Sequence, residues 1–440
     1  MKSNKHILFA LVVFLLLIAC QPTPEPKAYT QLSEEEIPDR VQETFDLYDG
    51  IRLSIDAPVT LPEETLPSAE ITRIEFSQEM IERVYATLCG DRPVYQFAEI
   101  KAELEACIML NRTQEALLRA ELGDDMIKRK DYFIRLMEDT LPTAPEEYTL
   151  GELADIRSYE DCIVKVDMGV KPIAFFQVSP IDADVRYVHF HNVGSEFVQN
   201  IPDAFPLVIT QEQAVEQAEE ILKKIGIIQN YSVAEVNIKA MYDSLYDGQL
   251  DDTVLPHAYE IIFLRTIADV EQNFSEQALM GTLTKYAPLF RPESITMTLN
   301  DTGLLLFEWI EPCEAVLEET PALIGLSSAL ERMKEQFSNT YNHYYFDELN
   351  EHYLNEKIDT GQVTIRIDRI VLGIVTLQGV NGSVRVVPIW EFFGNIECVV
   401  SGETMYYYPE YRELRDEKSR TNSLCSVDAV TGRVIDRTGM

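Results

Sequence analysis

Two histidines, His189 and His191, stand two positions apart in a stretch rich in the β-branched and aromatic residues that strands favour. Alternate residues of a strand point to the same face, so the two imidazoles would lie side by side, as two zinc ligands do. A zinc site needs three or four ligands, and no nearby Cys or Glu spacing supplies the others. The pair therefore favours a polar strand face, and metal binding stays an open alternative.

A second candidate is the acidic segment from Asp243 to Asp252, which surrounds Gly248. Read as a calcium loop that starts at Asp243, it has acids at the first, fifth and ninth positions and glycine at the sixth. Leu245 occupies the third position, and Val254 stands where a calcium loop needs a bidentate glutamate. We interpret the segment as a solvated turn, with a weak extracellular calcium site as the alternative.

Signatures of established enzyme classes are missing from the sequence. It contains no G-x-S-x-G, H-E-x-x-H or Walker motif, and paired acids are too frequent to single out a general acid or base. Six of the seven cysteines lack C-x-x-C spacing, and their disulfide pairing stays open. We therefore predict no catalytic residue, no cofactor and no enzyme.

The seventh cysteine, Cys20, has a distinctive setting. Lys2 and Lys5 precede the apolar stretch 7–19, which is too short to span a bilayer as a helix and is typical of a signal peptide. The stretch ends in Leu17-Ile18-Ala19-Cys20, and this ending resembles the lipobox of bacterial lipoproteins. The resemblance implies cleavage after residue 19, lipid attachment to Cys20 and a location at the outer face of the cell membrane.

The charge balance restricts the partners. The sequence has 74 acidic and 37 basic residues, a formal net charge of −37, so a nucleic acid is a poor partner. Residues 20–45 are rich in Pro and Glu and are predicted to form a disordered tether. We expect a membrane contact through the lipid on Cys20 and an envelope protein as partner, whereas the oligomeric state cannot be predicted.

The elements that must position these residues read as an α+β fold. Helices are predicted at 78–89, 98–121, 125–139, 210–225 and 327–337, and strands at 51–59, 162–193, 259–262, 304–309 and 390–393. Thr210 with Gln213, and Ser328 with Glu331, are predicted capping boxes. The predicted domains are an N-terminal α+β domain with a helical insert at 46–205 and two tandem helix-plus-sheet modules at 206–320 and 321–440.

The two modules share an order of helix, aromatic-Glu strand and Thr-Gly turn. The matching residues are Trp390, Glu391, Asp428, Ala429, Thr431, Gly432, Val434 and Ile435 in the second copy, and Tyr259, Glu260, Asp301, Thr302 and Gly303 in the first. Asp428 can accept hydrogen bonds from backbone amides ahead of it, and Gly432 can adopt a positive φ. The sequence around them therefore predicts a strand–turn–strand corner.

This pattern resembles the PepSY module and the similar YycH and YycI proteins, and the layout of the whole chain resembles clostridial lipoproteins of unknown function. The resemblance implies helix-on-antiparallel-sheet modules that make regulatory contacts at the cell envelope without catalysis. We therefore expect a non-enzymatic binding or regulatory lipoprotein. A solute-binding lipoprotein of a transporter is the first alternative, and an envelope hydrolase ranks below it.

Overall fold

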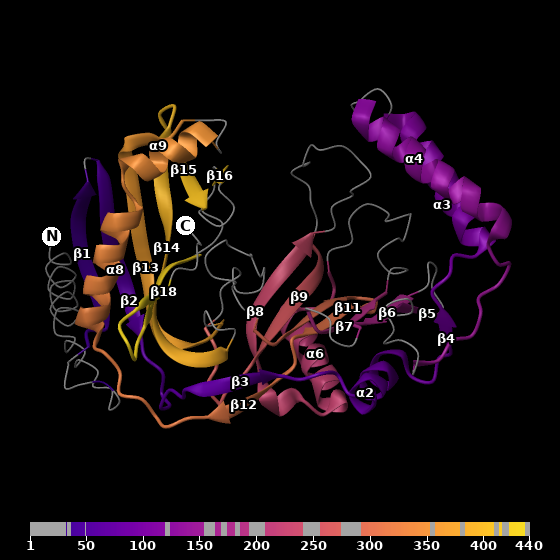
Figure 1. Cartoon of the computed structure of the whole chain (residues 1–440), viewed down its shortest axis with the longest axis horizontal. Coiled ribbons are helices and arrows are strands. Elements are labelled where there is room, and N and C mark those ends of the chain that lie inside the picture. The colour runs from indigo at the N-terminus through magenta and orange to yellow at the C-terminus, as the bar shows by residue number, and fades with distance from the viewer. Residues whose placement is uncertain are drawn as a thin grey trace, which may run out of the picture.

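The chain folds into a mixed α+β structure with two large sheets, here in a computed structural model (Figure 1). The described residues are 32, 37–48, 50–118, 124–153, 163–168, 174–180, 185–192, 207–240, 256–273, 292–352, 357–378, 383–408, 413–415 and 422–435. Each sheet has its own hydrophobic core, and the described residues form more strand than helix.

The first sheet has eight strands, and every neighbouring pair is antiparallel. Its order in space is β4 (Val94–Gln96), β5 (Ile163–Val166), β6 (Ala174–Val178), β7 (Tyr187–His191), β11 (Gly303–Ile310), β10 (Ser294–Asn300), β9 (Pro256–Arg265) and β8 (Tyr231–Ala240). Strands β4 to β7 form one antiparallel meander and β8 to β11 a second. The last strands of the two meanders meet in the middle of the sheet.

Two amphipathic helices, α2 (Gln78–Cys89) and α6 (Gln211–Ile225), cover one face of this sheet. Ala214, Ala218 and Leu222 of α6 recur at helical spacing and are fully buried against the strands. The predicted capping box of α6 is confirmed, because the Thr210 hydroxyl accepts the Gln213 amide and the Gln213 side chain accepts the Thr210 amide. The sequence therefore fixes the start of this helix locally.

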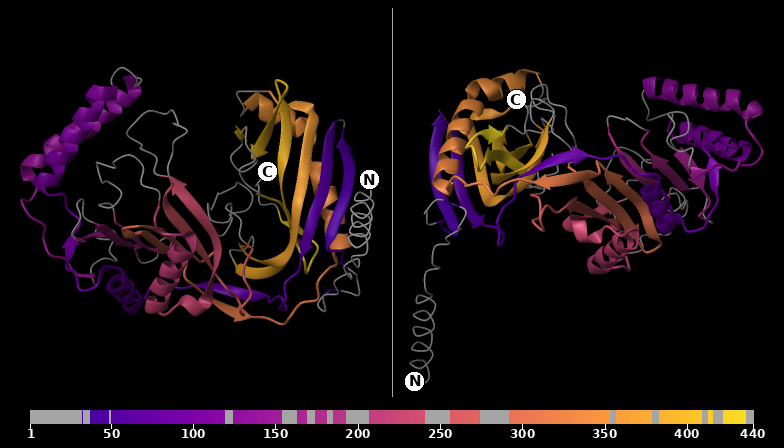
Figure 2. Two further views of the ribbon diagram at one scale, coloured as in Figure 1. Left: turned by 180° about the vertical axis from the view of Figure 1, so that it is seen from behind. Right: turned by 60° about the horizontal axis from the view of Figure 1, so that its bottom comes forward.

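A helical hairpin, the α3–α4 arm, leaves the sheet between β4 and β5. It consists of α3 (Lys101–Leu118) and α4 (Asp124–Thr140), and the short 3-10 turn Leu141–Thr143 ends it. The two helices pack mainly on each other and on this turn. Both views of Figure 2 show the arm projecting from the rest of the molecule. Among the helices described for this chain, none has the length and apolar content needed to cross a membrane.

The second sheet has ten strands built around β13 (Asp359–Gln378) and β14 (Val384–Val400), which pair antiparallel along most of their length. The other strands are β1 (Arg40–Tyr48), β2 (Ile51–Thr60), β3 (Ala69–Arg73), β12 (Cys313–Leu317), β15 (Glu403–Tyr408), β16 (Glu413–Arg415), β17 (Asn422–Asp428) and β18 (Val434–Ile435). Gly394 of β14 crosses so close to β13 that an added Cβ would lie 1.7 Å from the Arg366 carbonyl oxygen. Glycine is therefore required at this crossing.

Helices α8 (Leu326–Thr340) and α9 (His343–His352) accompany this sheet, and α8 buries Ala329, Met333 and Phe337. The predicted capping box of Ser328 and Glu331 is wrong. The helix begins at Leu326, and its N-cap, three residues before Ser328, is Gly325, which has no side chain to accept a backbone amide. The helix itself was nevertheless predicted at nearly the right place, because the periodicity of its apolar residues does not depend on the cap.

The sheets divide the chain differently from the predicted domain boundaries. Strand β2 was predicted in the N-terminal domain at 46–205, yet it pairs in parallel with β13 in the ten-stranded sheet. Strands β4 to β7 of the same predicted domain join β8 to β11 instead. The predicted disordered tether at 20–45 is wrong at its end, because residues 40–45 belong to strand β1, which pairs with β2. Figure 1 shows this arrangement, with the indigo strands β1 and β2 beside the orange strand β13. Both ends of the described chain therefore belong to one sheet, and residues 78–310 supply the other.

The predicted corner at Asp428 is confirmed. The Asp428 carboxylate accepts the amides of Val430 and Thr431 at 2.8 and 2.9 Å, Gly432 has a φ of 72°, and β17 pairs with β18. At the earlier turn, Asn300 accepts the Thr302 amide at 2.8 Å. Asp301 accepts the amides of 208 and 209 ahead of α6 instead. Asn300, and not Asp301, therefore occupies the position equivalent to Asp428.

Candidate functional site

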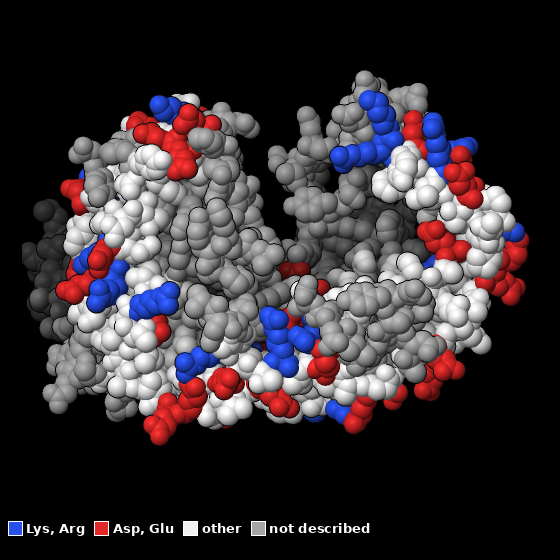
Figure 3. Space-filling view, in the orientation of Figure 1, with Lys and Arg blue, Asp and Glu red and all other residues white. Residues whose placement is uncertain are grey.

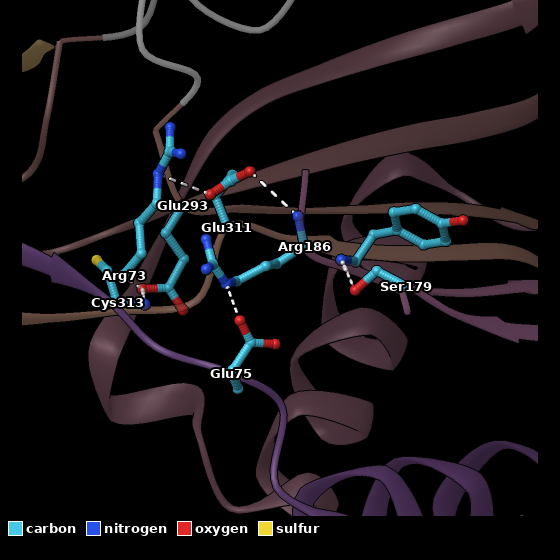
Figure 4. A network of polar contacts seen from close by, with 8 residues as sticks. Arg73, Glu75, Ser179, Arg186, Glu293, Glu311 and Cys313 are labelled. Carbon is cyan, nitrogen blue, oxygen red and sulfur yellow. Dashed lines mark hydrogen bonds and ion pairs between the residues drawn. The ribbon is translucent and has the colours of Figure 1, made fainter. Parts of the chain in front are cut away.

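A group of buried charges lies where the chain passes from one sheet to the other (Figure 4). Its centre is Glu293, which is 2% exposed and immediately precedes β10. One carboxylate oxygen accepts the Tyr231 hydroxyl and, at 3.0 Å, the indole N–H of Trp309. The other accepts Arg265 at 3.0 Å and both the amide and the thiol of Cys313 at 3.1 Å. This carboxylate therefore has both charge and hydrogen-bond partners.

Elements of both sheets supply these donors. Tyr231, Arg265 and Trp309 belong to β8, β9 and β11 of the eight-stranded sheet, whereas Cys313 begins β12 of the ten-stranded sheet. Burial, followed by the nearby Glu293 charge, raises the pKa of Cys313 above the ordinary thiol value. The same two causes raise the pKa of Tyr231 well above its usual range. Both groups therefore stay protonated near neutral pH and act as hydrogen-bond donors.

A second buried acid, Glu311, lies between β11 and β12. Its carboxylate is 3.1 Å from Arg73 of β3 and accepts the backbone amide of Arg186 at 3.2 Å. The Arg186 guanidinium in turn binds Glu75 (Figure 4). Glu311 has a φ of 50°, a backbone conformation that residues other than glycine rarely adopt. The surrounding ion pairs and the Glu311 amide bond to the Arg186 carbonyl, 2.8 Å, hold it in that conformation.

A further contact between the sheets is the segment 266–273, which follows β9. The Gln272 side chain accepts the Thr376 hydroxyl at 2.7 Å, and Asn273 donates to Glu391 of β14 at 2.9 Å. Ala268 and Asp269 both have positive φ values in the turn that precedes them. The segment and the β3–β12 ribbon together attach the eight-stranded sheet to the ten-stranded sheet. The charged groups of this junction hold the two sheets together, since each named carboxylate has a partner.

The predicted histidine pair lies on β7, on the sheet face opposite α2 and α6. The two rings stack with their centroids 6.0 Å apart and an interplanar angle of 16°. His189 stands across from Gln177 on β6 and from Glu308 on β11. Burial lowers the pKa of His189, and the Glu308 charge opposes this effect only in part. His189 is therefore neutral near pH 7, and its buried Nε2 has no hydrogen-bond partner in the structure.

The described residues place no third metal ligand beside this histidine pair. Within the described ranges, no group of three or more His, Cys, Asp or Glu side chains is arranged to hold a metal ion. His189 and His191 do lie on one face of β7, as their spacing predicted. The lipidation residue Cys20 and the acidic segment Asp243–Asp252 lie outside the described residues.

The cysteines that the structure describes are all free thiols. Cys89, Cys313, Cys398 and Cys425 are buried, as small apolar residues are, and Cys107 on the arm is exposed. Burial raises the pKa of Cys89 and Cys398 to about 12, so neither is a thiolate at neutral pH. A thiol in this state is a poor nucleophile.

One further buried charge fastens the α3–α4 arm to its sheet. Lys165 of β5 is 3% exposed and donates to Glu103 of α3 at 2.6 Å and to the Ala98 carbonyl at 2.8 Å. Its ammonium group lies 5.2 Å from the centre of the Tyr148 ring, and the Tyr148 hydroxyl also donates to Glu103. The base of the arm is thus held by an ion pair, a cation–π contact and hydrogen bonds.

Sequence reasoning missed Glu293, Glu311 and Lys165. Glu293 and Glu311 flank strands in a chain with 74 acidic residues, so residue type does not distinguish them from surface acids. A weak signal was available, because Glu311 and Cys313 enclose a proline directly after the apolar run of β11. A charged residue at the end of a buried strand requires a partner when the chain continues into a second sheet.

Comparison with known proteins gives little further information. No protein-family model and no curated protein matches the chain. Among solved structures, the chain is similar to an uncharacterised protein from Eubacterium rectale ATCC 33656. The two are 12% identical over 91% of this chain and 94% of that chain, with a TM-score of 0.44.

Proposed function

We propose that this chain is a non-enzymatic binding or regulatory protein at the outer face of the bacterial cell membrane, anchored there by lipid on Cys20. The observation that carries the proposal is the use of the buried ionisable groups. Glu293, Glu311 and Lys165 are each engaged in an ion pair that joins structural elements. Protein surfaces, rather than a set of reactive groups, are then the parts that act. An envelope protein is the proposed partner, and the net charge of −37 argues against nucleic acid.

The proposal includes a repeated helix-plus-sheet architecture of the PepSY type. The mirrored order of the eight-stranded sheet supports a helix-plus-sheet repeat within that sheet, because α2 precedes the meander β4–β7 and α6 precedes the meander β8–β11. The turn that ends in Gly303 contacts the residues ahead of α6 through Asp301. The turn that ends in Gly432 contacts the residue ahead of α8, because the Ile324 amide donates to the Ala429 carbonyl at 2.7 Å. Both contacts bring a Thr-Gly turn to the start of a helix.

The anchoring part of the proposal has a direct test. Cells that express the chain are grown with a clickable fatty acid, and the parent is compared with Cys20→Ser. We expect label on the parent and none on Cys20→Ser, with the parent recovered in the membrane fraction. Equal labelling of both chains would show that Cys20 is not the lipid site.

The binding part is tested by crosslinking in intact cells. A photoreactive residue is placed at Ile238 in β8, which is 62% exposed, and at Tyr344 in α9, which is 75% exposed. We expect one of the two positions to yield a discrete crosslinked envelope protein. Its recovery should fall with Glu293→Ala, which loosens the junction between the sheets. Only diffuse, position-independent crosslinks would contradict a specific partner.

A second candidate is a solute-binding lipoprotein. The observation in its favour is that two sheets are joined by adjacent chain segments, the antiparallel ribbon of β3 and β12. Solute-binding proteins place their ligand between two such lobes. Thermal-shift measurements against sugars, peptides and divalent metals separate the candidates. A ligand-specific rise in melting temperature would favour solute binding, because a ligand that binds only the folded state stabilises it.

A further inference from the structure

The α3–α4 arm presents apolar side chains to solvent. On α4, Tyr132, Phe133 and Leu136 are 64%, 57% and 51% exposed, and Met109 of α3 is 68% exposed. The three residues of α4 follow helical spacing and form one face. On this face the ring centroids of Tyr132 and Phe133 lie 5.8 Å apart. Ile134, on the opposite face, is 5% exposed and turns toward α3. Helix α4 therefore presents apolar side chains on its outward face as well as on the inward face that packs against α3.

The middle of this outward face carries basic side chains in a strongly acidic protein, and the exposed acid Asp139 lies beyond it near the end of α4. Lys128, Arg129 and Arg135 are exposed on either side of the aromatic residues. Residues 128–136 contain four basic residues and one acidic residue, whereas the chain as a whole has twice as many acids as bases. Figure 3 shows Lys and Arg side chains gathered over the arm in the upper right of the view. The arm thus combines cations with aromatic and aliphatic side chains on one exposed helical face.

We propose that this face of the α3–α4 arm binds the anionic surface of a phospholipid bilayer. Helices that lie in the bilayer interface have this composition, with Lys and Arg for the headgroups and aromatic or aliphatic residues for the acyl boundary. The charge complementarity is confined to residues 128–136, because the remaining acidic surface is repelled by anionic lipid. Tyrosine suits this depth because its ring is apolar and its hydroxyl is polar.

The position of the arm gives the contact a role. The arm and the N-terminal strand β1 lie at opposite ends of the molecule (Figure 1). The stretch from Cys20 to Leu32 spans at most about 40 Å when fully extended. A lipid at one end and the arm at the other would hold the protein along the membrane at two points, and two weak signals anchor more stably than one. This role rests on the proposed membrane location, whereas binding by the arm itself does not require lipid on Cys20.

The test uses a chain of residues 21–440, which lacks Cys20 and keeps every described residue. Co-sedimentation is measured with vesicles of phosphatidylcholine containing about 30% phosphatidylglycerol, and with vesicles of phosphatidylcholine only. We expect binding to the anionic vesicles, little binding to the neutral ones, and weaker binding as salt is raised. The double substitution Phe133→Ser with Leu136→Ser should lower the partition coefficient about tenfold or more. Arg129→Gln with Arg135→Gln should lower it and reduce its salt dependence.

The matched control is Tyr344→Ser, which removes an exposed aromatic from α9 on the other sheet and should leave vesicle binding unchanged. The proposal would be overturned if the chain did not co-sediment with the anionic vesicles. It would also be overturned if the arm variants and Tyr344→Ser lost vesicle binding to the same extent. If the arm variants instead abolish self-association while vesicles bind nothing, the face is a contact between copies and the membrane assignment is wrong. A failed fatty-acid labelling at Cys20 would leave the vesicle result standing, so the two failures are distinguishable.

Discussion

Replacing Glu293 by alanine removes the carboxylate at the centre of the junction between the sheets. Arg265, whose side chain is 21% exposed, would lose its counter-ion. The Trp309 indole and the Cys313 amide would lose their acceptor in a buried site. Breaking a buried ion pair costs about 3–5 kcal/mol because it leaves an uncompensated charge. Each unpaired buried donor adds about 1–3 kcal/mol where water cannot reach it.

We therefore expect Glu293→Ala to lower the free energy of unfolding of the eight-stranded sheet by about 5 kcal/mol, which combines the lost pair with partial relaxation of the donors. The two tryptophans of the chain provide a separate reporter for each sheet, since Trp309 lies in the core of the eight-stranded sheet and Trp390 in that of the ten-stranded sheet. Urea unfolding followed by fluorescence in a Trp390→Phe background reports the first sheet. The midpoint should fall by roughly 1–2 M.

The control for this experiment is Glu335→Ala. Glu335 is 66% exposed and pairs with Arg332 across one turn of α8, and an exposed pair of this kind contributes at most about 1 kcal/mol. If Glu293→Ala and Glu335→Ala unfold at the same urea concentration, the Glu293 carboxylate is not paired as described. The proposed role of the junction would then be refuted.

Three further outcomes are expected. Burial acts to raise the pKa of Glu103, but its hydrogen bonds from Lys165 and Tyr148 outweigh it, so the pKa lies below its usual range. Its stabilising effect is then present above the ordinary glutamate pKa and lost as the pH falls through the lowered one, and Glu103→Gln should flatten this acid limb in a pH series of melting curves. Gly432→Val places a β-branched residue at a φ of 72° and should destabilise the ten-stranded sheet by about 1–3 kcal/mol in urea unfolding, whereas parent-like unfolding would contradict the corner. Cys107 should react with a maleimide in the native protein before the buried thiols do, as peptide mass spectrometry would show, and equal rates would contradict their burial.

The sequence by itself determined the features that depend on neighbouring residues. The capping box of Thr210 and the corner at Asp428 follow from hydrogen bonds within a few positions, and both are present. The two imidazoles of β7 share a face because side chains alternate along any strand. These predictions held because no distant segment was needed to satisfy them.

Tertiary structure decided which strands pair and which charges are buried. Strand β2 pairs with β13, which follows it by about three hundred residues, and no local pattern in β2 specifies that partner. The acids at 293 and 311 look like surface residues in the sequence. Their burial follows only from the meeting of the two sheets, where cations and amides from β3, β9 and β12 surround them. The predicted domain boundaries differ from the division into two sheets for the same reason, since packing between distant segments decides which sheet a strand joins.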